Sequence, residues 1–205
     1  MSSWEQLRLT DRIEAGVQVL FVGINPGVKS AETGHHFAGP SNRFWKLLWE
    51  SRLVPEPLTY REDTRLPEFG LGITNLVARP SPGIDTLKPS EYVAGWTALE
   101  RKIERFTPQV VALVGVTLWR AILPLLPMEE GVRKKLATSK CPGPQRASIH
   151  GARVFVLPNP SGRNANYSYA EMLAAFRSLA RYKRKVDSTA AGDQENAAGE
   201  KPAGE

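Results

Sequence analysis

The stretch that decides the fold is residues 19–27, which read VLFVGINPG. Its first four residues are apolar, which predicts a buried strand. Pro26 has no N–H and fixes its own φ, so it ends the strand ladder and pushes Asn25 toward extended geometry. Gly27 permits a sharp turn or the close approach of a ligand. The sequence therefore predicts a neutral amide at the carboxyl end of a buried strand, where open α/β sheets bind ligands. An ordinary Asn-Pro-Gly turn is the alternative interpretation.

The composition indicates a globular protein with a basic surface. The 205 residues are 41% hydrophobic, and 27 Lys and Arg against 21 Asp and Glu give a formal charge of +6. Such a charge favours a polyanionic partner. The single cysteine, Cys141, suits the cytosol. No apolar run approaches the length of a membrane span, so we expect a cytoplasmic protein that does not bind a membrane. No His or Cys cluster suits a metal ion, so we expect no metal site.

Strands that alternate with helices predict one α/β domain, a three-layer sandwich with a mostly parallel central sheet. We expect strands near 17–22, 70–77, 110–115 and 152–157, and helices near 42–52, 90–106, 117–123 and 168–182. The expected helix caps are Ser41, Ser90 and a capping box of Ser168 with Glu171. Residues 28–40, 53–68 and 124–148 are expected to be loops, the second with a short helix.

The predicted domain covers residues 1–185. The remaining residues, 186–205, are mainly Gly, Ala, Glu, Asp and Lys. Because such a segment cannot bury apolar surface, we expect a disordered C-terminal tail.

A second bend repeats the pattern of the first. The strand at 152–157 runs into Asn159-Pro160-Ser161-Gly162, and two such strand ends can face each other across one cleft. His36 and Phe37 lie between them in a loop flanked by glycines. Paired amides, a stacking ring and basic surroundings suit a nucleobase, whose edge amides can read and whose face a ring can cover.

Five motifs in this order resemble the mismatch-specific uracil/thymine-DNA glycosylases of the uracil-DNA glycosylase superfamily. They are GINPG at 23–27, GHHF at 34–37, NRFWK at 42–46, GITN at 72–75 and NPSG at 159–162. The resemblance covers residues 15–182 and implies a uracil-DNA glycosylase-like fold. It also implies a monomeric, monofunctional enzyme that needs no cofactor and hydrolyses uracil, thymine or a modified pyrimidine from G·U or G·T mispairs in double-stranded DNA. Such an enzyme would work at the nucleoid of a bacterium or in the nucleus of a eukaryote.

The resemblance also assigns roles to residues. Asn25 matches the catalytic Asn that positions the attacking water. The positions that match base-binding residues are Ile24, Ser30, His36, Phe37, Asn75 and Asn159. A hydroxyl at Ser30 is more similar to the uracil-preferring members, whereas Asn75 is more similar to the thymine-processing branch. Each of three positions also has an alternative interpretation that needs no resemblance. Phe37 would then be an ordinary core residue, His36 a surface residue and Asn75 a buried amide bonded to backbone.

The loop after the second bend matches the wedge that enters the DNA helix. Its residues are Ser161, Gly162, Arg163 and Asn164. Arg163 is the candidate plug for the gap left by the base, and a solvated loop arginine is the alternative. Other members carry an arginine two positions later, where this chain has Ala165.

Two other functions remain open at this stage. A damage-binding module of the same fold would bind duplex DNA in a salt-dependent way without releasing product. An α/β enzyme for free nucleosides or nucleotides would ignore duplex structure, although the sequence has no Gly-rich phosphate loop.

Overall fold

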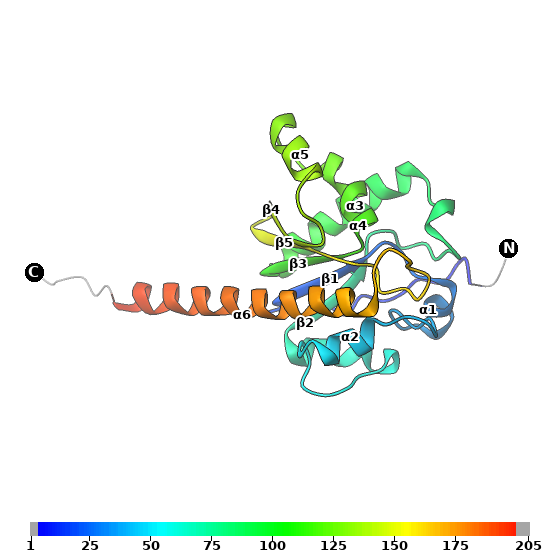
Figure 1. The fold of residues 1–205 in the computed structure, drawn as a ribbon, viewed down its shortest axis with the longest axis horizontal. Helices are drawn as coiled ribbons and strands as arrows, with labels where there is room; N and C mark the ends of the chain where they lie inside the picture. Colours follow the sequence, from blue (N-terminus) through cyan, green and yellow to red (C-terminus); the bar gives the residue numbers. More distant parts are fainter. Residues whose placement is uncertain (1–3, 200–205) are drawn as a thin grey trace, which may run out of the picture.

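The computed structural model describes residues 4–199, and the side chains of residues 4–184. A five-stranded sheet in the order β2-β1-β3-β5-β4 forms the centre, and helices cover both of its faces (Figure 1). The strands are β1 (Val19–Gly23), β2 (Leu71–Asn75), β3 (Val110–Val114), β4 (Gly143–Ile149) and β5 (Ala152–Leu157). The predicted three-layer α/β fold is confirmed.

The helices connect the strands and pack in the two outer layers. The α-helices are α1 (Val28–Thr33), α2 (Phe44–Glu50), α3 (Pro89–Phe106), α4 (Val116–Ile122), α5 (Glu130–Ala137) and α6 (Tyr169–Gly199). The 3₁₀ segments are η1 (Tyr60–Phe69), η2 (Ile84–Thr86) and η3 (Leu123–Leu125).

The pairs among β1, β2, β3 and β5 are parallel, and an isolated antiparallel bridge joins Arg12 to Ile73 of β2. β1 pairs in parallel with β2 and β3, and β3 pairs in parallel with β5. Of the five strands in the described part of the chain, β4 alone runs antiparallel, against β5. The carboxyl ends of β1, β2, β3 and β5 therefore meet at one edge of the sheet, which brings the two predicted bends to the same side of the molecule.

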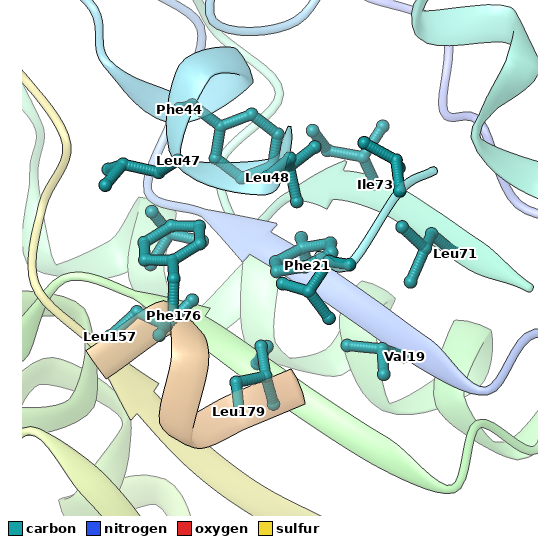
Figure 2. Packing of buried hydrophobic residues seen from close by; sticks show 14 of the residues in the cluster. Val19, Phe21, Phe44, Leu47, Leu48, Leu71, Ile73, Leu157, Phe176 and Leu179 are labelled. Atoms are coloured by element: carbon teal, nitrogen blue, oxygen red, sulfur yellow. The ribbon is translucent and has the colours of Figure 1, made fainter. Parts of the chain in front are cut away.

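Alternation along β1 builds a core on each face of the sheet. Val19 and Phe21 point to the layer of α2 and α6, where Phe44 and Phe176 pack over them (Figure 2). The intervening residues Leu20 and Val22 point to the layer of α3 and α4. All five residues of the strand are buried, which explains why its sequence is a continuous apolar run.

Three predicted loops contain regular structure. Residues 28–40 contain α1, residues 53–68 contain most of η1, and residues 124–148 contain α5 and most of β4. Strand β4 alternates buried and exposed residues at the edge of the sheet, so it has no apolar run to predict it. Leu136 is the one buried residue of α5, too weak a signal for a helical period.

Two of the predicted helix caps are wrong. Helix α2 begins at Phe44, whose N–H donates to Asn42 Oδ1 at 2.9 Å, so Asn42 and not Ser41 satisfies the first turn. Helix α3 begins at Pro89 and places Ser90 inside the helix. Ser41 and Ser90 each lie close to the start of a helix but do not occupy the N-cap position. Neighbouring side chains accept the hydrogen bonds from the backbone N–H groups there.

The capping box at the start of α6 is confirmed. Ser168 N and Oγ each donate to Glu171 Oε2 at 2.7 Å. The helix then continues to Gly199, beyond the end predicted near residue 182 and through most of the segment expected to be disordered. Figure 1 shows it extending past the rest of the molecule. A helix satisfies its backbone hydrogen bonds internally, so a lack of apolar residues does not exclude it.

Residues 200–205 of the predicted tail lie outside the described residues, and the domain limit at residue 185 stays a prediction. Within the described part of the chain, no helix has the length and apolar character needed to cross a bilayer.

Substitution of Gly95 by alanine should destabilise the fold, although alanine is normally the better helix residue. A Cβ at this position of α3 would overlap the backbone carbonyl of Leu76. We expect a loss of about 1–3 kcal/mol of unfolding free energy in urea denaturation. Gly131→Ala in α5 is the matched control, because nothing lies within 4 Å of its Cβ position. The control should be neutral or stabilising by up to about 1 kcal/mol, and a Gly95→Ala variant of equal stability would contradict the packing.

Candidate functional site

A cleft of about 700 Å³ opens at the carboxyl edge of the sheet. Asn25 lines it from the end of β1, Asn75 from the end of β2, and Asn159 from the loop after β5. Phe37 lines the same cleft from the loop between α1 and α2. The two Asn-Pro bends therefore converge on one hollow beside an aromatic ring, as the sequence predicts.

The amide of Asn25 has a fixed orientation. Its Nδ2 donates to Arg79 O at 3.1 Å and to Ser81 Oγ at 2.7 Å, and it lies 3.2 Å from Pro26 O. Because carbonyl oxygens only accept, the nitrogen must face them and Oδ1 must face the other way. Among the described residues no donor binds Oδ1, which leaves this oxygen available to accept a hydrogen bond from a bound molecule.

Phe37 is held by the core. Its ring stacks on Phe44 with centroids 4.3 Å apart and planes 23° from parallel, and Phe44 packs edge-on against Phe21 of β1 at 5.3 Å. The backbone of Phe37 has φ of 51°, a left-handed conformation that costs a non-glycine residue about 1–2 kcal/mol. Such strain concentrates where a side chain must be presented at a site. The structure therefore places Phe37 at the boundary of core and cleft.

His36 is buried rather than on the surface, with 1% of its area exposed. Its Nε2 lies 3.0 Å from Thr10 O, which only accepts, so Nε2 carries the proton. Nδ1 of the neutral ring can then accept from Asn75 Nδ2 at 3.4 Å. Burial lowers the pKa of His36 from its ordinary 6.5, and this favours the neutral ring. His36 thus turns the Asn75 amide, with Nδ2 on the histidine and Oδ1 against Gly23.

Gly23, at the end of β1, also lines the cleft. A Cβ there would lie 2.6 Å from Asn75 Oδ1 and 3.5 Å from Phe37 Cζ. No side chain fits, so glycine at this position allows Asn75 and Phe37 to pack close to the backbone at the end of β1.

Ser30 and Ile24 also line the cleft, as predicted, and both are buried. Ser30 Oγ accepts a hydrogen bond from Ala38 N at 3.0 Å, which leaves the hydroxyl proton for another acceptor. The carbonyl of Ile24 accepts from Val77 N at 2.8 Å. This bond ties the first bend to the segment after β2.

The second bend is a closed loop. Asn159 Oδ1 accepts from Ser161 N at 3.0 Å, and Asn164 Nδ2 donates to Asn159 O at 2.8 Å. A Cβ on Gly162 would lie 2.6 Å from the Cβ of Ser41, so the loop packs tightly on the segment before α2. Ser161 and Arg163 line the cleft, whereas Gly162 and Asn164 do not and serve the loop itself.

The cleft contains few charged groups. Among its lining residues the acidic side chain is Glu32, which is exposed and lies 4.0 Å from Lys29. Across the residues that the structure describes, no cluster of three or more His, Cys, Asp or Glu side chains could hold a metal. The chemistry next to Asn25 is therefore that of neutral amides, a hydroxyl and an aromatic ring.

Comparison with known proteins assigns this architecture. The model of the uracil DNA glycosylase superfamily matches residues 10–180. The chain belongs to this superfamily. It is 41% identical over 152 residues to the G/U mismatch-specific uracil DNA glycosylase of Schizosaccharomyces pombe, which covers 73% of this chain and 45% of that relative. The chain thus spans less than half the length of that curated relative.

The fold of the superfamily is also seen in a solved structure. The solution NMR structure of a candidate uracil DNA glycosylase from Methanosarcina acetivorans superposes with a TM-score of 0.54. The alignment covers 85% of this chain and 98% of the other at 18% identity, so it supports the fold alone.

Two residues of this superfamily member escaped the sequence analysis. Ser81 is buried, accepts from Asn25 Nδ2 and donates its own proton to Gly83 O at 2.6 Å. It therefore fixes the catalytic candidate from behind. Ser81 lies in a segment rich in proline and glycine that indicates a loop and nothing more.

The second missed residue is Asp63, whose carboxylate is fully buried. It accepts from His36 N at 3.0 Å and from Arg12 Nε at 3.2 Å, and it lies 3.0 Å from His35 Nδ1. These contacts hold the 34–38 loop against η1. In the sequence Asp63 stands in a charged stretch that is typical of an exposed loop, so no local signal marks it.

The stability of the fold should fall as the pH drops below 6.5. Burial lowers the pKa of His36 in the folded protein, so the unfolded chain takes up this proton first. The contribution is complete above pH 6.5 and is lost toward the lower folded pKa, by at most about 1.4 kcal/mol per pH unit. Urea denaturation at a series of pH values measures the slope.

His36→Gln should remove this part of the pH dependence. His150→Gln is the matched control, because His150 is partly exposed and pairs only loosely with Glu100 at 3.9 Å. The control should keep the slope of the unmodified protein. An unchanged slope in His36→Gln would show that another group titrates.

Proposed function

We propose that the protein is a DNA glycosylase that hydrolyses uracil from G·U mispairs in double-stranded DNA as a step of base excision repair. The observation that carries this proposal is the fixed amide of Asn25, which lines the same cleft as Phe37 and whose Oδ1 has no donor among the described residues. The activity printed for the Schizosaccharomyces pombe relative supports it. Thymine and modified pyrimidines of G·T and related mispairs belong to the same proposed substrate class.

The extruded base binds in the cleft against the Phe37 ring. The ring covers the face of the base, and Asn75 presents its amide to the edge. Ser30 lines the cleft. By the resemblance we assign it to the substituent at the pyrimidine C5, where its hydroxyl favours uracil over thymine. Ile24, His36 and Asn159 complete the proposed base-binding residues, His36 through Asn75.

Asn25 Oδ1 accepts a hydrogen bond from a water and aims its oxygen at the anomeric carbon of the deoxyribose. The water oxygen bonds to C1′ while the C1′–N1 bond breaks, and the bonding electron pair leaves with the uracil. The water keeps one hydrogen as the new C1′ hydroxyl and gives the other proton to solvent, while N1 of the departing uracil anion takes up a proton from solvent. The products are free uracil and an abasic site. Because an amide is not a strong base, orientation and leaving-group stabilisation supply the rate enhancement, and turnover is expected to be slow.

The loop that carries Ser161 and Arg163 is the proposed wedge. Arg163 is exposed and its side chain lines the mouth of the cleft, where it fills the space left by the extruded nucleotide. Gly162 and Asn164 hold the loop in shape. A mispaired uracil is extruded more easily than a Watson–Crick paired base, which contributes to the choice of substrate.

The physiological setting is part of the same proposal. The enzyme acts as a monomer on mispaired duplex DNA, in the bacterial cytoplasm at the nucleoid or in a eukaryotic nucleus. A lone cysteine fits a reducing compartment, and the excess of basic residues fits a polyanionic substrate.

Asn25→Ala tests the proposed mechanism. It should slow release of labelled uracil from a G·U duplex by about 100- to 1,000-fold, because the water loses its orienting acceptor. Asn166→Ala is the control, since Asn166 is exposed in the loop and does not line the cleft. Equal cleavage by Asn25→Ala and the unmodified protein would refute the assigned role. Salt-dependent binding without any release by the unmodified protein would favour a damage-binding module instead.

Ser81→Ala should reduce the rate constant of the chemical step by about twofold to tenfold, which corresponds to one neutral hydrogen bond. KM should stay unchanged, because Ser81 acts on Asn25 and not on the base. Single-turnover kinetics with the G·U duplex separates the two parameters. Ser90→Ala, an exposed serine in α3, serves as the control. A change in KM with an unchanged chemical step would contradict a positioning role.

A further inference from the structure

A second groove lies outside the proposed active site, between α4 and α5. Its volume is about 610 Å³. Val116, Leu123 and Pro124 form an apolar part of its wall. Its charged lining residues are Arg120, Arg133, Lys134 and Glu130. An apolar wall with an excess of cationic side chains fits an anionic ligand that also has an apolar or flat part.

The groove and the active-site cleft are lined by residues that are close neighbours along the chain. Val114 at the end of β3 lines the cleft, and Val116 at the start of α4 lines the groove. Similarly, Arg163 of the wedge loop lines the cleft, and Tyr167 at the end of that loop lines the groove. A linear ligand that occupies the cleft can therefore extend into the groove past the wedge loop.

The positive charges of the groove are largely uncompensated. Arg120 is exposed and has no acidic partner among the described residues. Arg133 Nη2 donates to the carbonyls of Leu126 and Met128 at 3.3 and 3.2 Å, while its buried Nε has no partner. Lys134 pairs with Glu130 at 2.8 Å, but both side chains are about three-quarters exposed. Such a pair is weak enough to open when a phosphate offers a better contact.

We propose that the α4–α5 groove binds the backbone of the same DNA, on one side of the extruded nucleotide. The proposal rests on the proposed function for the identity of the ligand. Arg120 and Lys134 contact phosphates, Arg133 adds a fixed positive charge, and the apolar wall lies against deoxyribose. The groove thus sets the position of the duplex on the enzyme without reading its sequence.

The test uses the salt dependence of DNA binding, measured by fluorescence anisotropy with an undamaged G·C duplex. The logarithm of the binding constant falls as the logarithm of the salt concentration rises. Loss of one phosphate contact should make this slope less steep by about 0.9, which means that a tenfold change in salt changes the affinity about eightfold less. Arg120→Ala should show this change, and Arg120→Glu a larger one. Arg101→Ala and Arg101→Glu are the matched controls, because Arg101 is exposed on α3 near the opposite edge of the sheet.

The controls should bind with the slope of the unmodified protein or with a much smaller change. Equal slopes for the Arg120 and Arg101 variants would overturn the proposal, because the effect would then reflect net charge alone.

The two proposals fail in different ways. If the unmodified protein releases no uracil but Arg120→Ala still makes the salt dependence less steep, the proposed glycosylase activity is wrong and the proposal that the groove binds DNA is supported. If uracil is released but the slope is unaffected, the groove proposal alone is wrong.

Cys141 provides a second measurement that needs no charge change. It is the single cysteine of the sequence, is partly buried and lines the groove. Saturating duplex should protect it from alkylation by the neutral reagent N-ethylmaleimide, and Arg120→Glu should lose this protection at the same DNA concentration. Alkylation at an equal rate with and without bound duplex would place the DNA elsewhere.

Discussion

The arrangement of the site depends on one buried carboxylate. Asp63 has no exposed surface, so its charge must be met by donors within the protein. The donors come from Arg12 and from the 35–36 segment, which ties the N-terminal segment and η1 to the loop that carries His36 and Phe37. If any of these partners moved away, the buried charge of Asp63 would be less well compensated, which is costly in free energy. This cost keeps the loop in one conformation.

Two sets of contacts hold the residues of the cleft in place. The aromatic contacts from Phe21 through Phe44 to Phe37 connect the core of the sheet to the ring beside the cleft. Polar contacts from Arg79 and Ser81 fix the Asn25 amide. In the mechanism that we propose, fixed groups matter because a neutral amide lacks the basicity to activate water and contributes through geometry. The same packing that stabilises the fold therefore prepares the site.

The sequence by itself determined the fold class and the two bends. Continuous apolar runs such as that of β1 are visible because a central parallel strand is buried on both faces. β1 ends at Gly23, shortly before Pro26, and β5 ends at Leu157, directly before Pro158. Proline restricts the ladder at these positions by local chemistry that requires no tertiary information. The motifs around Asn25, Phe37 and Asn159 could likewise be assigned to a family, and the superfamily match confirms this. The sequence could not show α5 or β4, whose apolar signals are short and interrupted.

Only the tertiary structure decided how the site is held together. His36 could be a surface residue or a pocket residue until the fold buried it between Thr10 and Asn75. Ser81 and Asp63 lie in segments whose composition indicates ordinary loops, and their roles come from partners that are distant in sequence. Hydrogen bonds of this kind depend on which segments meet in space, whereas apolar periods and proline bends act on neighbours along the chain. The sequence therefore determined where the site lies, and the packing determined which way its amides face.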